Sequence, residues 1–229
     1  MTPRLADEVE HALAEAGADA LHRPELARYG GLVLDRNRSL NLTAARTPEA
    51  FAGQILDALT LLPYAASPLI DVGSGAGLPG IVLAIAGGCE VTLVDATAKK
   101  VAFLADALRA LDLPGRALAG RAEELARDPE LRERFACATA RAVGPAPTVL
   151  ELTLPFLCVG GRALLQRGAW EPHESDACAD AALVLGGRMS EEITLGDRRR
   201  IVVVDKVAPT VARFPRRAGV PARRPLCLT

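Results

Sequence analysis

The sequence lacks the patterns that mark secreted, membrane-embedded or zinc-binding proteins. Its cysteines are odd in number and include no C-x-x-C pair, which argues for reduced thiols and against a zinc site. No run of about 18 apolar residues could span a bilayer, and residues 1–15 carry acids where a secretion signal would be basic and then apolar. We therefore expect a cytoplasmic protein without a metal centre. The five cysteines are Cys89, Cys137, Cys158, Cys178 and Cys227.

A large excess of either charge is also missing. The formal net charge is −1, which by itself discourages a nucleic-acid partner, but residues 206–229 contain no acid at all. A basic, proline-stiffened tail of this kind could follow a phosphate backbone, although a solvated, partly ordered terminus fits the same residues. The cations of this tail are Lys206, Arg213, Arg216, Arg217, Arg223 and Arg224.

Length and hydrophobic periodicity divide the chain into two parts. Half of its 229 residues are hydrophobic, which allows one sizeable core with an appendage. Residues 1–66 read as helical, with Thr47 as a cap and Pro48 at a first helical position. Residues 67–229 alternate short apolar runs with helical segments, which predicts βαβ units on a mostly parallel sheet. The candidate strands are 69–72, 91–95, 116–119, 137–140, 162–166 and 201–207.

The most informative stretch is LIDVGSGAGLPGIVLAI, residues 69–85, where alternate glycines interrupt an apolar run. This pattern predicts a strand, a tight loop and a helix. Gly73, Gly75 and Gly77 remove side chains where the backbone turns and where a ligand can approach it closely. Asp95 ends the next apolar run about 20 residues later, where an acid can accept hydrogen bonds from ribose hydroxyls. A nucleoside cofactor is the predicted occupant.

The glycines alone leave two cofactor classes open. The dinucleotide pattern G-x-G-x-x-G fits only from Gly75, although the first glycine after the strand is Gly73. Asp71 lies just before the loop, where its carboxylate would repel a pyrophosphate and attract the sulfonium of S-adenosylmethionine. We therefore favour S-adenosylmethionine over NAD.

Residues after the other strands are also candidates, because ligands bind at the carboxyl ends of strands in open α/β sheets. The third strand is followed by GRAEE, residues 120–124, whose backbone and Glu123 carboxylate could meet an adenine edge. A second interpretation places these acids in the exposed first turn of a helix. The fourth strand is followed by Arg141, which we expect near the transferred group, with a loop-anchoring role as the alternative.

Together these segments resemble the bacterial 16S ribosomal RNA methyltransferase G family (RsmG), first named glucose-inhibited division protein B. The motifs are LIDVGSGAGLPGI, VDATAKKVAFL, GRAEEL, ARAV and APTVARFPRRAGVPARRPL, and the resemblance covers residues 37–226. It implies a Rossmann-like α/β class I methyltransferase fold with a mostly parallel seven-stranded sheet, helices on both faces and a preceding helical segment. It also implies methyl transfer from S-adenosylmethionine to N7 of a guanine in the decoding region of 16S ribosomal RNA. The implied substrate is the RNA, the small subunit or its assembly intermediate, and the implied enzyme is a monomer.

The resemblance assigns roles by position. The implied cofactor contacts are Gly73, Leu78, Asp95, Ala122, Glu123 and Arg141, which add to Asp71, Gly75 and Gly77 from the loop. The residues implied around the reaction centre are Asn37, Asn41, Lys100, Arg141 and Arg167. Arg36 and Leu40 replace frequent aromatic residues, so base stacking there loses its usual side chains. Gln54 and Ala58 replace a histidine and a serine, which leaves Gln54 and Asp57 to serve target binding on that helix.

Methylation of guanine N7 needs no strong base, because N7 has an in-plane lone pair at neutral pH and can attack the sulfonium methyl directly and in line. The protein would contribute by positioning, which provides roughly 7 to 11 kcal/mol in favourable cases. Two alternatives use the same fold. One is a small-molecule S-adenosylmethionine-dependent methyltransferase, for which the basic tail is irrelevant, and the other is a Rossmann-like binding module without activity.

Overall fold

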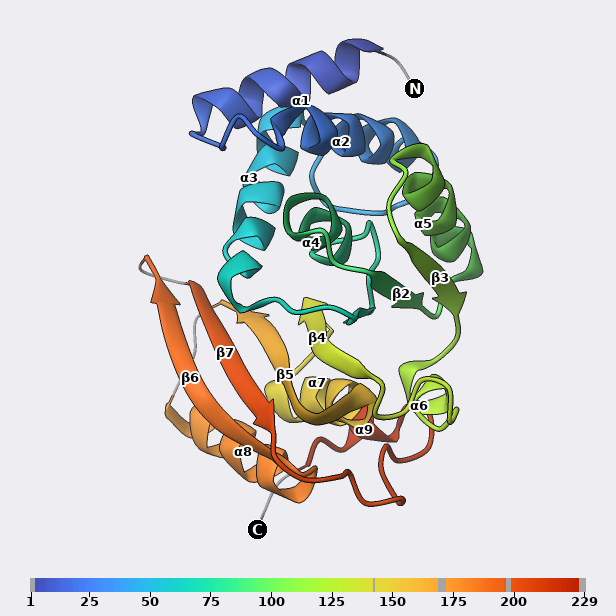
Figure 1. The fold of residues 1–229 in the computed structure, drawn as a ribbon, viewed down its shortest axis with the longest axis vertical. Coiled ribbons are helices and arrows are strands. Elements are labelled where there is room, and N and C mark those ends of the chain that lie inside the picture. Colours follow the sequence, from blue (N-terminus) through green and yellow to red (C-terminus); the bar gives the residue numbers. More distant parts are fainter. Residues whose placement is uncertain (1–2, 142, 169–171, 197–198, 227–229) are drawn as a thin grey trace.

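The computed structural model describes residues 3–141, 143–168, 172–196 and 199–226 as an α/β fold preceded by three helices (Figure 1). Those helices are α1 (Pro3–Glu15), α2 (Arg23–Asn37) and α3 (Pro48–Leu59). The strands are β1 (Leu69–Val72), β2 (Val91–Asp95), β3 (Gly115–Ala119), β4 (Phe135–Arg141), β5 (Leu157–Arg167), β6 (Gly187–Leu195) and β7 (Arg199–Lys206). The later helices are α4 (Gly80–Gly87), α5 (Ala98–Ala110), α6 (Ala122–Leu125), α7 (Ala146–Thr153), α8 (Pro172–Val184) and α9 (Val220–Arg223), with short 3-10 turns at Leu62–Tyr64 and Leu154–Phe156.

The seven strands form one sheet in the order β3-β2-β1-β4-β5-β7-β6. Four pairs are parallel, namely β1 with β2, β1 with β4, β2 with β3 and β4 with β5. Strand β7 is antiparallel to both β5 and β6. The predicted mostly parallel seven-stranded sheet is confirmed, and the carboxyl ends of β1, β2, β3 and β4 meet along one edge.

Strand β6 was not among the six strands predicted from the sequence. It is the edge strand, and its outward-facing side chains are polar, as the segment GRMSEEITL shows. A strand at the edge of a sheet pairs with one neighbouring strand and needs no continuous apolar run. The hydrophobic pattern of β6 is therefore weak. The other six strands lie where they were predicted, with β4 and β5 extended at both ends and Val207 falling outside β7.

Alternate residues along the central strands enter two hydrophobic cores, one on each face of the sheet. In β1, Leu69 packs with α4, α5 and the preceding helices, whereas Ile70 packs with α6, α7 and α8. The helices α1 to α3 share the first core, and the hydroxyl of the fully buried Tyr29 on α2 donates to Ala76 O in the glycine loop at 3.0 Å. The division at residues 66 and 67 stays a prediction, since the core is continuous across it.

The first turn of α3 forms as predicted. Thr47 has an extended backbone, and its Oγ1 accepts a hydrogen bond from the Ala50 N–H at 3.3 Å, while Pro48 begins the helix. Capping of this kind satisfies a backbone donor that the helix itself leaves unpaired. The helix therefore starts at a fixed point, which places Gln54 and Asp57 on its middle turns.

Gly80→Ala is expected to destabilise the fold by about 1 to 3 kcal/mol, because overpacking a filled core has costs of this size. A Cβ at this first residue of α4 would lie 2.5 Å from Leu93 Cδ2 and 2.9 Å from Asp71 Cβ. Gly53→Ala is the matched control: Gly53 lies in α3 with open space around its Cβ position, so alanine should stabilise that helix slightly. Urea unfolding of both variants tests this, and equal effects would contradict it.

Candidate functional site

The glycine loop joins the end of β1 to the start of α4. Gly73, Gly75 and Gly77 have φ values of +72°, +56° and +102°, which residues with a Cβ adopt at a cost. A Cβ on Gly77 would also lie 2.5 Å from Ile81 Cδ1. The loop needs glycine at these positions both to turn and to pack. Because glycine has no side chain, the backbone of the loop faces the site.

The carboxylate of Asp71 lies beneath this loop and is fully buried. Its Oδ1 accepts a hydrogen bond from Thr139 Oγ1 at 2.8 Å, and its Oδ2 accepts one from the Gly80 N–H at 3.2 Å. Burial raises the pKa of Asp71 to about 6, although these hydrogen bonds and the charge of Arg141 lower it. Because the carboxylate has no exposed surface, its influence on a cation in the site acts through its field.

Asp95 ends β2 and faces the same loop. Its Oδ2 accepts a hydrogen bond from the Gly75 N–H at 3.0 Å, and its Oδ1 accepts one from the Thr97 N–H at 2.8 Å. Each carboxylate oxygen has a second lone pair, so both can still accept from an outside donor. The two backbone contacts orient the carboxylate in the way that a ribose acceptor requires.

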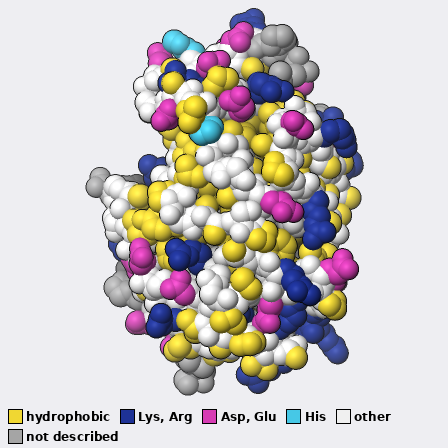
Figure 2. All heavy atoms as spheres, in the orientation of Figure 1, with side chains coloured by type: hydrophobic (Ala, Val, Ile, Leu, Met, Phe, Trp, Pro, Cys, Tyr) yellow, Lys and Arg dark blue, Asp and Glu magenta, His cyan; other side chains and the backbone are white. Residues whose placement is uncertain are grey.

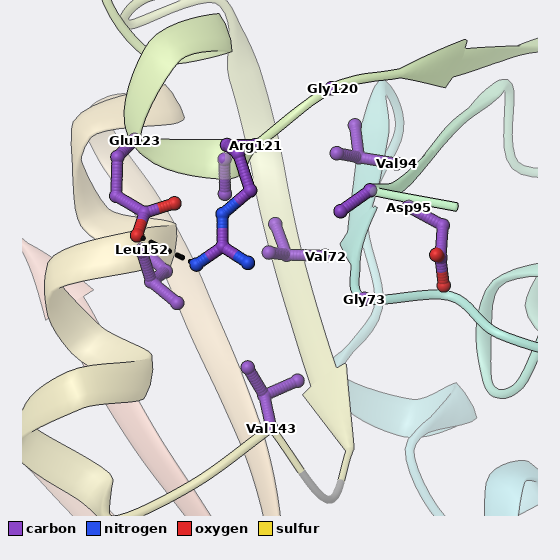
Figure 3. A pocket seen from close by; sticks show the side chains of 11 residues that line it. Val72, Gly73, Val94, Asp95, Gly120, Arg121, Glu123, Val143 and Leu152 are labelled. Atoms are coloured by element: carbon purple, nitrogen blue, oxygen red, sulfur yellow. Dashed lines mark hydrogen bonds and ion pairs between the residues drawn. The ribbon is translucent and has the colours of Figure 1, made fainter. Parts of the chain in front are cut away.

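A cavity of about 100 Å³ opens beside Asp95 (Figure 3). Figure 3 shows Asp95 at one end and Glu123 at the other, with Arg121 and the apolar Val72, Val94, Val143 and Leu152 between them. These apolar walls suit the faces of a purine ring. The lining residues are Val72, Gly73, Val94, Asp95, Ala96, Gly120, Arg121, Ala122, Glu123, Val143 and Leu152.

Glu123 is nearly buried at the far end of this cavity and is held from two sides. Its Oε1 accepts hydrogen bonds from Arg121 Nη2 at 3.1 Å and from the Gly219 N–H at 2.8 Å. Burial raises the pKa of Glu123, but the Gly219 N–H and the Arg121 guanidinium more than offset this and leave the pKa below its usual value. Glu123 is therefore a fixed carboxylate, which excludes the interpretation of an exposed first-turn residue.

A second cavity of about 350 Å³ adjoins the first, and Gly73 lines both. Its other lining residues are Leu42, Thr43, Ala44, Gln54, Ser74, Gly75, Ala76, Leu78, Lys100 and Arg141. Both cavities thus lie along the glycine loop. The second cavity brings the predicted Leu78, Lys100 and Arg141 to one place.

Asn37 shapes the second cavity from outside it. Its Nδ2 donates to Thr43 O and Ala45 O at 3.0 Å each, and its Oδ1 accepts from the Leu42 N–H at 2.8 Å and the Thr43 N–H at 3.1 Å. The amide thus folds residues 42–45 into the loop that covers the glycines. The structure gives this predicted reaction-centre residue a positioning role.

A third cavity of about 400 Å³ lies beyond Arg141, which lines both the second and the third. Asp57 on α3 holds two arginines there: its Oδ2 lies 3.7 Å from Arg141 Nη1, and its Oδ1 lies 2.8 Å from Arg199 Nη1. The remaining lining residues are Gln166, Arg167, Gly168, Leu195 and Arg200. Arg167 Nη2 lies 3.8 Å from Glu174 Oε1, and Arg200 Nη1 is paired with Glu192 Oε1. The four arginines therefore exceed their carboxylate partners by one, which leaves the cavity with a small excess of positive charge.

The structure gathers most of the predicted site residues but not all of them. Asn41 is exposed, accepts a hydrogen bond from Arg46 Nη2 at 3.2 Å and lines none of the three cavities. Arg167 lies in the third cavity, where its Nη1 donates to Gly144 O at 2.6 Å. Ala142, part of the ARAV motif, lies outside the described residues.

Sequence reasoning missed several lining residues. Val143 lies two residues after β4 and Arg199 begins β7, so inspecting the residues around strand ends could have found them. Leu152 on α7 carries no local signal, because only the tertiary fold brings it to the first cavity.

Residues 206–226 of the basic tail are folded onto the protein. The Nζ of the buried Lys206 donates to Leu154 O at 3.0 Å and contacts Thr210 Oγ1, and burial lowers the pKa of Lys206 to about 8. Arg216 is paired with the fully buried Glu151. Lys206 is buried and the guanidinium of the half-buried Arg216 is paired with Glu151, so we expect phosphate contacts from the exposed Arg213, Arg217, Arg223 and Arg224.

Among the described residues, no group of three or more His, Cys, Asp or Glu side chains is placed to hold a metal ion. No helix within the described ranges has the length and hydropathy needed to cross a membrane. Cys89, Cys137, Cys158 and Cys178 are free thiols, and Cys227 lies outside the described residues.

The fold and the site together define a class I S-adenosylmethionine-dependent methyltransferase. The bare glycine backbone, the oriented Asp95 carboxylate and the partly apolar cavity beside it fit a nucleoside, and the buried Asp71 fits a cation next to it. Solved structures show the same fold at low identity. A branched-chain polyamine synthase from Thermus thermophilus matches with a TM-score of 0.57 and 16% identity, covering 82% of this chain and 64% of that one. A geranyl diphosphate C-methyltransferase from Streptomyces coelicolor matches with a TM-score of 0.55 and 14% identity, covering 71% and 78%.

Sequence comparisons identify the family. The model of the GidB family, described as rRNA small subunit methyltransferase G, matches residues 22–202. Two relatives with the name ribosomal RNA small subunit methyltransferase G are each 38% identical. The relative from Pelotomaculum thermopropionicum aligns over 97% of this chain and 99% of its own length, and that from Deinococcus deserti over 99% and 98%. The chain belongs to the rRNA small subunit methyltransferase G family, uses S-adenosylmethionine and methylates small-subunit ribosomal RNA.

The affinity for S-adenosylmethionine is expected to fall as the pH drops from 7 to 5, because Asp71, with a pKa of about 6, then becomes protonated and neutral. S-adenosylhomocysteine has no sulfonium charge, so its affinity should change much less over the same range. In Asp71→Asn the difference between the two ligands should no longer depend on pH. Calorimetric titrations of both ligands at several pH values test this, and parallel pH profiles in the wild type would contradict it.

Ionisation of Asp71 also affects folding. Because its pKa in the folded protein lies above the usual value of 3.8, the folded state retains a proton that the unfolded chain has lost. The contribution of this group to stability is therefore full below pH 4 and is lost as the pH rises through 6.

Proposed function

We propose that the protein transfers the methyl group of S-adenosylmethionine to N7 of a guanine in the decoding region of 16S ribosomal RNA. The observation that carries this is the row of three adjoining cavities, joined by Gly73 and then by Arg141. The first cavity suits the nucleoside portion of S-adenosylmethionine. The second suits its methionine portion with the cationic sulfonium, and the third suits an anionic substrate. A nucleic-acid target fits the four arginines that line the third cavity, which exceed their carboxylate partners by one.

The cofactor would be held by the chain's own backbone and carboxylates. Asp95 accepts from the ribose hydroxyls, Ala122 and Glu123 meet the adenine edge, and the glycine loop lies against the amino-acid portion. Leu78 and Lys100 close the second cavity from the side of α4 and α5. The same cofactor supplies an electrophilic methyl group, which guanine N7 approaches in line.

The reaction needs positioning more than proton transfer. Guanine N7 carries a free lone pair, and none of His11, His22 and His173 lines the three cavities. Arg141 lies between the second and third cavities, where its guanidinium can donate to guanine O6 and leave N7 free. The ion pair with Asp57 fixes the direction of Arg141 from α3.

The exposed tail arginines offer a second surface for phosphates, apart from the third cavity. Figure 2 shows Lys and Arg side chains gathered at the lower right of this face, over the region of α6 and the C-terminal segment. The acceptor RNA would lie between this surface and the third cavity. We further propose that the protein acts as a monomer in the cytoplasm, on the small subunit or its assembly intermediate.

A label-transfer experiment tests the function. Small subunits lacking the modification are incubated with the protein and methyl-labelled S-adenosylmethionine, and the labelled nucleotide is mapped. Label at guanine N7 in the decoding region supports the proposal. Label at another atom or region contradicts it, and transfer to small molecules but to no RNA favours the small-molecule methyltransferase.

Replacing Arg217 and Arg223 with Gln should weaken RNA binding and reduce its salt dependence. Each lost phosphate contact lowers the slope of log affinity against log salt by about 0.7 to 0.9, so two should lower it by about 1.4 to 1.8. Both side chains are exposed, so the fold is retained. Deleting the whole tail would not be a clean test, since Phe214 and Arg216 are packed into the protein.

Arg4→Gln is the control for this prediction. Arg4 is 85% exposed on α1 and pairs only with the neighbouring Glu8 among the ion pairs of the described residues. Binding is measured by fluorescence titration from low to high salt. An unchanged slope in the double variant would remove the tail from the RNA interface.

A further inference from the structure

The C-terminal segment is attached at the wall of the nucleoside cavity, far from its own place in the sequence. We call residues 207–226 the strap. The strap leaves the sheet after β7, crosses α7 and the region of α6, and ends beyond α9 (Figure 1). Its hydrogen bonds to residues 123–151 reach back over 65 to 96 positions in the chain.

The first attachment of the strap is Glu123 itself. The Gly219 N–H donates to Glu123 Oε1 at 2.8 Å, on the carboxylate that closes one end of the cavity in Figure 3. Arg121 donates to the same oxygen from the other side at 3.1 Å. Without the strap, this nearly buried carboxylate would lose one of its two fixed donors and would be free to rotate.

The second attachment is Glu151. The next residue in the chain, Leu152, lines the cavity. The carboxylate of Glu151 is fully buried, and Arg216 binds it with its guanidinium at 2.6 to 3.0 Å and with its backbone N–H at 2.7 Å. A planar guanidinium paired in this way fixes direction as well as distance. Arg216 therefore sets the position of α7 and, through it, of Leu152.

The third attachment lies just after α6. Arg132 donates to Phe214 O at 2.9 Å and to Thr210 O at 2.7 Å, and Arg127 donates to Pro215 O. Thr148 on α7 also donates to Pro221 O at 2.9 Å. The strap thus joins the two helices, α6 and α7, that contribute one side of the cavity.

We infer that Gly219 and Arg216 are positioning residues for the cofactor: Gly219 acts through Glu123, and Arg216 acts through Leu152. Binding of the cofactor in the cavity and docking of the strap then strengthen each other. The inference rests on the proposed placement of the adenine portion in the cavity of Figure 3. If a docked strap raises the affinity of the cavity for its ligand, the ligand must raise the stability of the docked strap by the same factor. The exposed arginines of the strap then lie on the element that supports cofactor binding.

Hydrogen exchange on the wild-type protein tests the inference without any substitution. With S-adenosylhomocysteine as the probe at saturating concentration, the protection of the Gly219 amide should rise at least tenfold. The Ile193 amide, in the distant β6–β7 pair, serves as the internal control and should change little. Unchanged protection at Gly219, with binding of the probe established by calorimetry, would overturn the inference.

A conservative substitution tests the reciprocal effect. Arg216→Lys keeps the charge next to Glu151 but loses the two-pronged geometry, so the dissociation constant and the KM for S-adenosylmethionine should rise threefold to tenfold with kcat little changed. Arg109→Lys alters an exposed arginine paired with Asp106 on α5 and should leave both constants unchanged. An Arg216→Lys variant with wild-type affinity would contradict the inference. Failure of the probe to bind the wild type would instead contradict the placement of the cofactor.

Discussion

We expect Asp95→Ala to lower the affinity for S-adenosylmethionine by at least about 100-fold. The substitution removes the hydrogen bonds between the ribose hydroxyls and a charged carboxylate, each of which contributes roughly 1.5 to 3 kcal/mol. Both oxygens of Asp95 are already oriented by the Gly75 and Thr97 N–H groups, so no reorganisation is needed when ribose hydroxyls arrive. The substitution also frees Gly75, which loosens the glycine loop. Isothermal titration calorimetry measures the loss directly.

A substitution series separates these contributions. Asp95→Asn keeps the shape and one acceptor oxygen, and we expect an intermediate loss of about tenfold, since a neutral acceptor is roughly half as strong as a charged one. Asp106→Ala removes an exposed carboxylate of α5 and should bind as the wild type does. If Asp95→Ala bound within threefold of the wild type, Asp95 would not be the ribose acceptor.

Arg216→Met is expected to lower the free energy of unfolding by about 3 kcal/mol, because it leaves a buried carboxylate without its cation. Glu151 has no exposed surface, and its carboxylate receives three contacts from the Arg216 side chain. The Arg216 side chain is itself about a quarter exposed, so we expect the loss of unfolding free energy to lie at the lower end of the range for broken buried ion pairs. Urea unfolding followed by circular dichroism provides the measurement.

The double variant Arg216→Met with Glu151→Leu distinguishes a buried charge from lost packing. Removing both charges should recover much of the stability, since an apolar pair of similar size often replaces a buried ion pair without loss. Arg109→Met, which breaks an exposed pair, should change stability by less than about 0.5 kcal/mol. A double variant no more stable than Arg216→Met would show that the ionic contact is not the source of the effect.

The cofactor end of the site could be predicted because its chemistry is local in the sequence. A strand, a glycine loop and an acid at the next strand end lie within 27 residues, and strand order then brings Asp71 and Asp95 to the same edge. Backbone conformation at Gly73, Gly75 and Gly77 leaves little choice of residue. Each of these sequence patterns extends over a few positions, and at that range the sequence predicts local structure well.

The acceptor end depended on contacts that no local pattern contains. Asp57 orients Arg141 and Arg199 from a helix 84 and 142 positions away, and the family resemblance directed attention to Asp57 without indicating these partners. The family resemblance implies that Asn37 is a reaction-centre residue, yet all four hydrogen bonds of its side chain go to the loop at residues 42–45. Polar type alone did not distinguish a side chain that faces a cavity from one that builds its wall.

The basic tail shows the same limit for charge. Six cations without an acid suggested a uniform solvated segment, but Lys206 and Arg216 have buried partners in other elements. Those partners, Leu154 O and Glu151, are invisible to a charge count along the tail. The prediction of phosphate contacts therefore applies to the exposed arginines only.

The pairing of Glu151 with Arg216 has a consequence for synthesis of the protein. Glu151 leaves the ribosome 65 residues ahead of its arginine, a delay of about 3 to 13 seconds at usual elongation rates. During that interval the nascent helix around Glu151 carries an unmatched carboxylate on the face that later becomes apolar core. The growing chain therefore cannot complete its own cofactor cavity until nearly all of it has been translated.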